Sequence, residues 1–131
     1  MIGLDTNVLV RYIAQDDTKQ SPRATALIAA LTSEQPGFIA SVSLIELVWV
    51  MQSCYEATKE EIVLILEMLL RTKEFVVENA ETAIKALHVF SGLKADFADC
   101  IIEQSAKKAG CEYTYTFDKD AAKTTGMRLV G

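Results

Sequence analysis

Short apolar segments alternate with helical patterns along the whole chain, and this alternation limits the possible folds more than any other feature. The segments MIGL, GFIA, EFVVE, EYTYTF and MRLV are short and apolar enough to be buried strands. The stretches between them carry apolar residues at helical spacing. Strands separated by helices pair in parallel, with helices on both faces of the sheet. The sequence therefore predicts an α/β fold with three layers.

The helical stretches carry start signals of unequal strength. In TKEEIVLILEMLLR, Thr58 stands as N-cap and Glu61 follows three residues later, which is the pattern of a capping box. The stretch SVSLIELVWVMQSCY is rich in residues that favour strands, but its length and the capping residues Ser41 and Ser43 favour a helix. No repeat, linker or low-complexity segment interrupts the 131 residues. We therefore expect a single domain over residues 1–131.

The composition argues against several kinds of site. His88 is the only histidine, which leaves little room for a histidine-based triad or a histidine-rich metal site. The cysteines Cys54, Cys100 and Cys111 lack zinc-ligand spacing and are expected to be reduced. With 13 basic and 18 acidic residues, the net charge of −5 argues against binding nucleic acid through phosphate neutralisation alone. A carboxylate cluster that holds metal ions would itself supply part of this negative charge.

The sequence shows no targeting or membrane signal. The longest apolar stretch is interrupted by Glu46 and is too short to span a bilayer. Met1 leads into an apolar segment without a basic region or a cleavage site, so no secretory signal is predicted. We therefore expect a cytoplasmic protein.

Glu46 lies within the apolar stretch SLIELVWVM. A carboxylate that faces an apolar interior loses its hydration, so it needs a basic partner or an opening to water. The helix that carries Glu46 offers no basic residue before Lys59. We therefore interpret Glu46 as a side chain that faces an opening to water, close to other acids.

Acidic residues from four segments fall near one edge of the predicted sheet. They are Asp5 and Asp118, which directly follow strands, Asp96 and Asp99, which open a helix, and Glu46, about one turn into another helix. Open α/β sheets bind ligands at the carboxyl ends of their strands. Clustered carboxylates repel one another unless a divalent cation neutralises them. Oxygen ligands without imidazole or thiolate suit Mg²⁺ or Mn²⁺.

Each of these acids also has an ordinary explanation. Asp5, Asp96 and Asp118 all stand where a helix N-cap would, and Asp is a common N-cap. For Asp96, capping and metal support are equally open. Asp120 is expected to be only a charge at a helix start. Glu103, one helical turn after Asp99, is a candidate for the rim of the site, but we favour the alternative that it faces solvent.

Four segments together carry a resemblance to a known family. In this order and at these intervals, IGLDTNVLVRYI, SLIELVW, ADFADCIIEQSAKKAGC and YTFDKDA resemble PIN-domain proteins of the VapC toxin type. The likeness covers essentially the whole chain, with Cys100 and Ile101 as a mild departure. It implies that the family's acid quartet corresponds to Asp5, Glu46, Asp99 and Asp118, that Asp96 is an auxiliary acid, and that Asn7 and Thr116 orient the acids or metal waters.

The resemblance implies about five parallel strands in the order 3-2-1-4-5 and a metal-dependent endoribonuclease. One or two Mg²⁺ or Mn²⁺ ions would activate a water that attacks the phosphodiester bond, so that no protein nucleophile is needed. The sequence does not indicate whether the RNA is tRNA, rRNA or mRNA. Basic residues in segments near the same edge are candidates for contacts to the RNA backbone: Arg11, Lys19, Lys94, Lys119 and Lys123.

The apolar character of two predicted helices indicates that other protein chains cover them. The stretches VSLIELVWVMQS and EEIVLILEMLLR are apolar around most of their circumference. A helix of this kind needs burial on more than one side. We therefore expect a homodimer to cover part of this surface, and a small antitoxin protein, which the resemblance implies, to cover another part.

The alternatives are a phosphatase or phosphotransferase, a receiver domain and a non-catalytic binding module. A phosphatase of the haloacid-dehalogenase kind also has an Asp after its first strand, but it needs a second Asp two positions later, where this chain has Asn7. A response-regulator receiver domain needs a phospho-accepting Asp after a central strand, where this chain has Ser41 or Asn79. Metal-dependent cleavage of RNA that is lost in Asp5→Asn would separate the nuclease from all of these.

Overall fold

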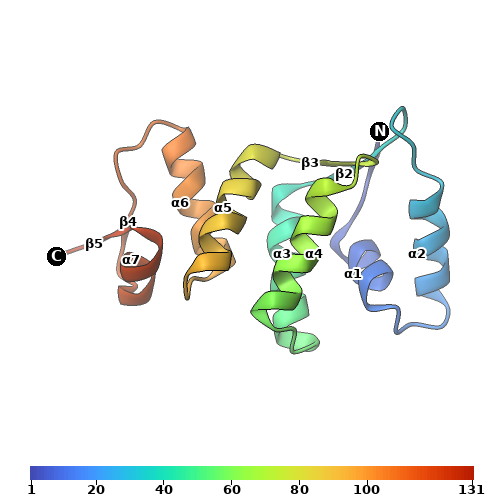
Figure 1. Cartoon of the computed structure of the whole chain (residues 1–131), viewed down its shortest axis with the longest axis horizontal. Helices are drawn as coiled ribbons and strands as arrows, with labels where there is room; N and C mark the ends of the chain where they lie inside the picture. The colour runs from blue at the N-terminus through green and yellow to red at the C-terminus, as the bar shows by residue number, and fades with distance from the viewer. The chain divides into compact units, whose positions relative to one another are not determined.

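The computed structural model describes every residue from Met1 to Gly131 and divides into two compact units, Met1–Ala80 and Glu81–Gly131 (Figure 1). The expected single domain over residues 1–131 stays a prediction. None of the helices combines the length and the apolar character that a membrane span needs.

The first unit holds a parallel three-stranded sheet. β1 pairs with β2, and β2 pairs with β3, so that Ile2 lies opposite Gly37 and Phe38 lies opposite Val76. Helix α1 packs against α2 and α3. The elements are β1 (Ile2–Gly3), α1 (Thr6–Ala14), α2 (Gln20–Ala29), β2 (Gly37–Ile39), α3 (Ser41–Cys54), α4 (Lys59–Arg71) and β3 (Phe75–Val77).

The core of the first unit is aliphatic. Its fully buried side chains come from α1, β2, α3 and α4 and are Leu9, Ile39, Leu44, Leu47, Ile62, Leu66 and Leu69. Gly37 begins the central strand where no side chain fits. A Cβ atom there would lie 2.7 Å from Cδ1 of Leu4 and 2.9 Å from Cδ1 of Leu31. The absence of a side chain at residue 37 therefore lets the central strand pass under these two leucines.

Helix α4 begins as the sequence predicts. Oγ1 of Thr58 accepts a hydrogen bond from the backbone N–H of Glu61 at 3.2 Å, and Oε1 of Glu61 accepts one from the backbone N–H of Thr58 at 2.9 Å. This capping box satisfies two amides at the helix start that have no partner within the helix. The prediction of a capping box at Thr58 is confirmed.

Helix α3 is present as predicted, but the prediction that Ser41 or Ser43 caps it is wrong. The N-cap position is Ala40, which has no capping side chain. The backbone N–H of Ser41 donates instead to Oε1 of Glu78 at 2.9 Å, and Oγ of Ser41 donates to the carbonyl of Glu78 at 3.2 Å. Glu78 follows β3, so the acceptor comes from a part of the chain that local sequence does not reveal.

The second unit contains a smaller parallel sheet. Its elements are α5 (Ala80–Gly92), which begins at the unit boundary, α6 (Phe97–Lys108), β4 (Tyr115–Thr116), α7 (Lys119–Thr125) and β5 (Arg128–Leu129). β4 and β5 pair with Tyr115 opposite Arg128. The buried rings of Phe90 in α5 and Phe97 in α6 meet edge to face, with centroids 5.7 Å apart. Gly126 ends α7 at a φ of 87°, a conformation that glycine adopts without strain.

The five strands thus form one sheet of three strands and one of two. Within these sheets the pairing is parallel, and the neighbours follow the 3-2-1 and 4-5 parts of the predicted order. The α/β class is therefore correct. The junction of β1 with β4, which would make one five-stranded sheet with helices in two outer layers, stays a prediction.

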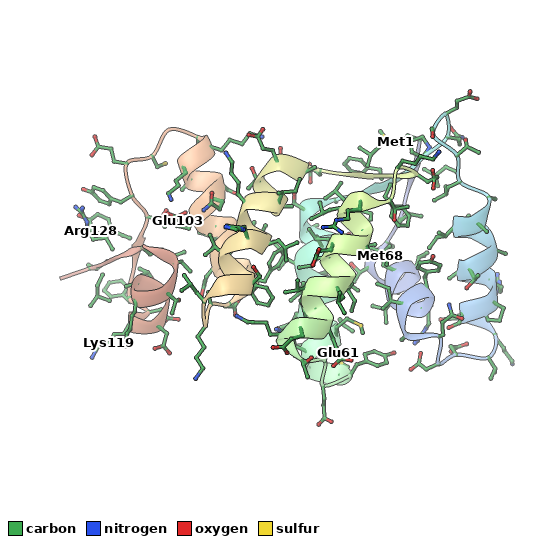
Figure 2. All side chains as sticks on the ribbon, in the orientation of Figure 1. Met1, Glu61, Met68, Glu103, Lys119 and Arg128 are labelled. Carbon is green, nitrogen blue, oxygen red and sulfur yellow. The ribbon has the colours of Figure 1, made fainter.

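Glu103 in α6 is buried, so the expectation that it faces solvent is wrong (Figure 2). Its position is three residues from Cys100, which places both on the buried face of the helix. Nζ of Lys107 lies 3.2 Å from Oε1 of Glu103, and Oε2 has no hydrogen-bond partner. The sequence expectation was wrong because it did not take into account the face of the helix on which Glu103 lies.

Candidate functional site

Asp5 stands where β1 gives way to α1. Its backbone is extended, with φ −75° and ψ 157°, and it is the N-cap of α1. Oδ1 of Asp5 accepts a hydrogen bond from the backbone N–H of Thr6 at 2.7 Å. This bond satisfies a helix amide through one oxygen only, and a carboxylate has a second oxygen with which to hold a ligand.

Thr6 connects Asp5 with Glu46. The backbone N–H of Thr6 donates to Asp5, and its hydroxyl donates to Oε1 of Glu46 at 2.7 Å. Glu46 lies in α3, and its neighbours Leu47 and Val48 are buried while Glu46 itself is exposed. Thr6 is not among the site residues that the sequence predicts. The signal for it in the sequence is a hydroxyl residue directly after the acid that follows the first strand.

Asp5 and Glu46 line the same cavity. Its volume is about 440 Å³, and its walls come from α1, α3 and the segment that follows α3. Glu46 therefore faces an opening to water at its own position in an otherwise apolar helix. The lining residues are Asp5, Thr6, Asn7, Val10, Arg11, Glu46, Val50, Cys54 and Tyr55; below we call this the acidic cavity.

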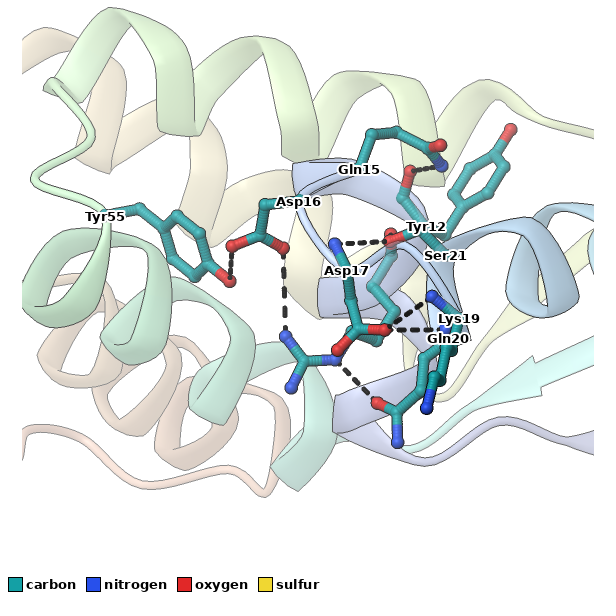
Figure 3. Close-up of polar contacts among 9 residues, drawn as sticks. Tyr12, Gln15, Asp16, Asp17, Lys19, Gln20, Ser21 and Tyr55 are labelled. Atoms are coloured by element: carbon teal, nitrogen blue, oxygen red, sulfur yellow. Dashed lines mark hydrogen bonds and ion pairs between the residues drawn. The ribbon is translucent and has the colours of Figure 1, made fainter.

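Arg11 brings a positive charge to the acidic cavity. Its Nε donates to Oε1 of Gln20 at 2.7 Å, and its Nη1 lies 3.7 Å from Oδ1 of Asp16 (Figure 3). The hydroxyl of Tyr55 donates to Oδ2 of Asp16 at 2.9 Å, and this hydrogen bond raises the pKa of Tyr55 above its usual value. Asp16 thus holds both Arg11 and Tyr55 at the wall of the cavity.

In the second unit, Asp96 and Asp99 lie at the start of α6. Asp96 is the N-cap, and its Oδ1 accepts a hydrogen bond from the backbone N–H of Ala98 at 2.8 Å. Asp99 is half-buried in the first turn. Burial raises the pKa of the Asp99 carboxyl above its usual value, and the negative charges of Asp96 and Asp118 raise it further. Asp96 and Asp118 therefore lie near enough to Asp99 for their charges to act on it.

Asp118 stands between β4 and α7. It is the N-cap of α7, and its Oδ1 accepts hydrogen bonds from the backbone N–H groups of Asp120 at 2.8 Å and Ala121 at 3.2 Å. Oγ1 of Thr116 accepts a hydrogen bond from the backbone N–H of Asp118 at 3.0 Å. Thr116 thus fixes the backbone of the acid two residues later. Asp120 takes part through its backbone and lies in the first turn of α7.

Comparison with known proteins identifies the family. The model of the PIN domain family matches residues 2–127. This chain belongs to the PIN-domain family. The matched range contains the acids of both units, from Asp5 to Asp118.

Two known proteins are similar to this chain. A protein named VapC ribonuclease from Aquifex aeolicus (strain VF5) is 25% identical over 127 residues, which cover 97% of this chain and 93% of the relative. A chain from the crystal structure of FitAcB from Neisseria gonorrhoeae is matched over 100% of this chain and 97% of its own length, with 18% identity and a TM-score of 0.38.

The acids expected to form one site are divided between the two units of the PIN domain. Asp5 and Glu46 share the acidic cavity of the first unit, and in the second unit the charges of Asp96 and Asp118 act on Asp99. Neither unit alone contains three or more His, Cys, Asp or Glu side chains placed to hold a metal ion. The donors are nevertheless carboxylate oxygens. Burial is the main cause of the raised pKa of Asp99, and the negative charges of Asp96 and Asp118, which a cation would offset, add to it. This donor chemistry fits Mg²⁺ or Mn²⁺.

The remaining candidate residues differ in whether they line the acidic cavity. Asn7 lines the acidic cavity together with Arg11. The four lysines are exposed: Lys19 directly before α2, Lys94 between α5 and α6, and Lys119 and Lys123 in α7. None of the four lines the acidic cavity. Cys54, which does line it, forms no disulfide.

Proposed function

We propose that this PIN-domain protein is an endoribonuclease that depends on Mg²⁺ or Mn²⁺ and acts as the toxin of a toxin–antitoxin pair. The observation that carries the proposal is the acidic cavity, in which Asp5 and Glu46 meet from separate segments of a chain that belongs to the PIN family. The VapC ribonuclease relative supports the same activity.

The proposed metal ligands are Asp5, Glu46, Asp99 and Asp118, with Asp96 in a supporting role. Capping does not compete with this role, because the capping bonds of Asp5, Asp96 and Asp118 are made through Oδ1. The proposal requires the acids of the two units to converge. Thr6 would hold the carboxylate of Glu46, and Thr116 would hold the backbone of Asp118, so that each acid presents a fixed oxygen.

The chemistry that such an ion supplies is the activation of water for attack on phosphorus and the neutralisation of charge on the phosphate. The carboxylates would hold and orient the ion, and no side chain of the cavity needs to act as a nucleophile. We expect products with 5′-phosphate and 3′-hydroxyl ends. Asn7 would orient the acids or a water at the mouth of the acidic cavity, which it lines.

Cleavage of RNA by purified protein tests the proposal. Wild-type protein with Mn²⁺ should cleave RNA, and chelation should abolish cleavage. Asp5→Asn should lower the rate steeply because it removes a charged ligand while retaining a good N-cap. Asp120→Asn, in the first turn of α7, is the matched control and should cleave at the wild-type rate. Metal-independent cleavage, or wild-type activity in Asp5→Asn, would refute the proposal.

Exposed apolar side chains support the proposed partners. Val42 and Trp49 of α3 are 63% and 65% exposed, and Leu64 of α4 is 67% exposed. Large apolar groups on a surface favour association with another protein. We propose that a second copy of the chain covers part of this surface and that a small antitoxin covers another part. A strict monomer in sedimentation at micromolar concentration would contradict the dimer.

We further propose that the protein acts in the cytoplasm, where an RNA substrate is accessible. Sequencing of RNA ends after brief expression in cells would map the cleavage sites and identify the RNA as tRNA, rRNA or mRNA. Enrichment of the protein in a membrane fraction would contradict the proposed location.

A further inference from the structure

A second cavity lies beside the acidic cavity in the first unit. Its volume is about 390 Å³, and it lies between α1 and α2, which pack together. Asn7 and Arg11 line both cavities, so the two adjoin each other at these residues. The lining residues are Asn7, Val8, Arg11, Gln20, Arg23, Ala24 and Leu27; below we call this the arginine groove.

The arginine groove has the opposite charge to the acidic cavity. It is lined by Arg11 and Arg23 and by no acidic side chain. The acidic cavity shares Arg11 but is also lined by Asp5 and Glu46, so its charged side chains are predominantly acidic. This contrast is local, because the chain as a whole carries a net charge of −5. An anion that approaches this unit is therefore attracted by the groove rather than by the protein as a whole.

Arg11 is held in place at the junction of the two cavities. Gln20 accepts from its Nε at 2.7 Å, and Asp16 lies 3.7 Å from its Nη1. Asp17 in turn fixes the start of α2, because its Oδ1 accepts from the backbone N–H groups of Lys19 at 2.9 Å and Gln20 at 2.7 Å (Figure 3). A guanidinium that is already oriented loses little further entropy when it binds an anion.

Arg23 supplies the charge that is not neutralised within the unit. It lies three residues after Gln20, on the same face of α2, and its side chain is exposed. No carboxylate of the first unit forms an ion pair with it. A guanidinium offers planar pairs of donors that match the oxygens of a phosphate.

We propose that the arginine groove binds a phosphodiester group of the RNA strand that neighbours the bond to be cleaved. The inference rests on the proposed function, since it places the strand across the acidic cavity and into the groove. Asp5 and Glu46 repel an RNA strand, and the nearby guanidinium groups of Arg11 and Arg23 offset this repulsion for the adjoining phosphate. The groove therefore determines on which side of the cleaved bond the protein holds the RNA.

Binding in the absence of metal tests the groove separately from catalysis. The probe is a fluorescein-labelled single-stranded RNA of mixed sequence, titrated with protein in a chelator so that cleavage does not occur. Arg23→Ala should weaken binding by about fivefold, the upper range for an exposed ion pair. It should also reduce the slope of log Kd against log salt by about 0.7, the value for one phosphate contact on a single strand. Arg23→Lys should keep the slope and recover part of the affinity.

The matched control is Arg71→Ala. Arg71 is an exposed arginine on α4 that pairs with Glu67 of the same helix at 3.0 Å and does not line the groove. It should bind RNA with the wild-type Kd and slope. Alanine is a good helix former, so both variants should keep their helices, which melting curves would verify.

Replacing one phosphodiester of the RNA with an uncharged methylphosphonate identifies the phosphate that occupies the groove. In a set of RNAs that each carry one methylphosphonate, one position should weaken binding to wild type about fivefold and leave binding to Arg23→Ala unchanged, because the two changes remove the same contact. Equal Kd and slope for wild type and Arg23→Ala overturn the groove, even if wild type cleaves RNA. A loss of affinity in Arg23→Ala for an acidic peptide, but not for RNA, would also overturn the proposal that the groove binds RNA. If wild type neither binds nor cleaves RNA, the proposed function fails as well.

Discussion

At the scale of single residues, Thr6 is the side chain that ties the two acids of the first unit together. Its hydroxyl fixes Oε1 of Glu46 at 2.7 Å, and its amide fixes Oδ1 of Asp5 at the same distance. Thr6→Val keeps the branched shape but removes the hydroxyl, so Glu46 loses its orienting donor. We expect RNA cleavage and Mn²⁺ affinity to fall by about 10- to 100-fold, the usual cost of losing a group that orients a ligand.

Thr6→Ser retains the hydroxyl and is the matched control for Thr6→Val. It should bind Mn²⁺ and cleave RNA nearly as wild type does. Isothermal titration with Mn²⁺ and single-turnover cleavage measure the two effects separately. If Thr6→Val matches wild type in both, the hydrogen bond to Glu46 has no part in the site.

The sequence predicts which acids stand at strand ends and helix starts, but it does not predict which way their side chains face. The sequence predicted that Asp5 and Asp118 follow strands and that they stand at helix starts, and both lie there as N-caps. The sequence does not show that capping and metal binding are compatible, although one carboxylate can do both through different oxygens. The burial of Glu103 was missed because its helix face is determined by tertiary packing.

At the scale of elements, the start of β2 depends on a position without a side chain. A Cβ on Gly37 would lie 2.7 Å and 2.9 Å from methyl carbons of Leu4 and Leu31, closer than such atoms approach. Gly37→Ala should therefore lower the free energy of unfolding by about 1–3 kcal/mol, the usual cost of overpacking a core. Gly3→Ala, in the neighbouring strand, is the control, because a Cβ there meets nothing within 4 Å. Urea unfolding measures both, and equal midpoints for the two variants would contradict the steric argument.

The elements were predictable where the signal was local. The capping box at Thr58 and the length of the α3 segment sufficed to predict helices. The start of α3 was not predictable in detail, because its acceptor is Glu78, which lies far away in sequence. The last strands were predicted too long: EYTYTF forms a strand only at Tyr115–Thr116, since a strand ends where its hydrogen-bonded partner ends.

At the scale of the whole molecule, the proposed metal site requires acids from both units. The first unit contributes Asp5 and Glu46, and the second contributes Asp99 and Asp118. Neither unit alone offers a complete cluster. A metal ion held by all four acids would therefore stabilise the joined chain, and its effect on unfolding reports whether the units share one site.

The resulting prediction compares melting curves with and without Mn²⁺. An ion at about 100 times its Kd should stabilise the wild-type fold by roughly 2.7 kcal/mol, provided that it binds only the folded protein. For a chain of this length, the melting temperature should rise by on the order of 10 °C. Glu46→Gln in the first unit and Asp99→Asn in the second should each lose most of this rise, because each removes one of the shared ligands. Asp120→Asn should keep it.

Substitution of Asp99 changes the melting temperature of the metal-free protein, and the direction of this change distinguishes a shared metal site from simple capping. Asp99 has a raised pKa because it is half-buried near Asp96 and Asp118, so its charge is unfavourable without a cation. Asp99→Asn should therefore raise the melting temperature of the metal-free protein while it removes the response to Mn²⁺. If the metal site lay within one unit, only one of the two substitutions, Glu46→Gln or Asp99→Asn, would abolish the rise in melting temperature with Mn²⁺. If wild type shows no shift up to millimolar Mn²⁺, and Glu46→Gln destabilises the metal-free form, then Glu46 acts through its hydrogen bond with Thr6 and not as a metal ligand.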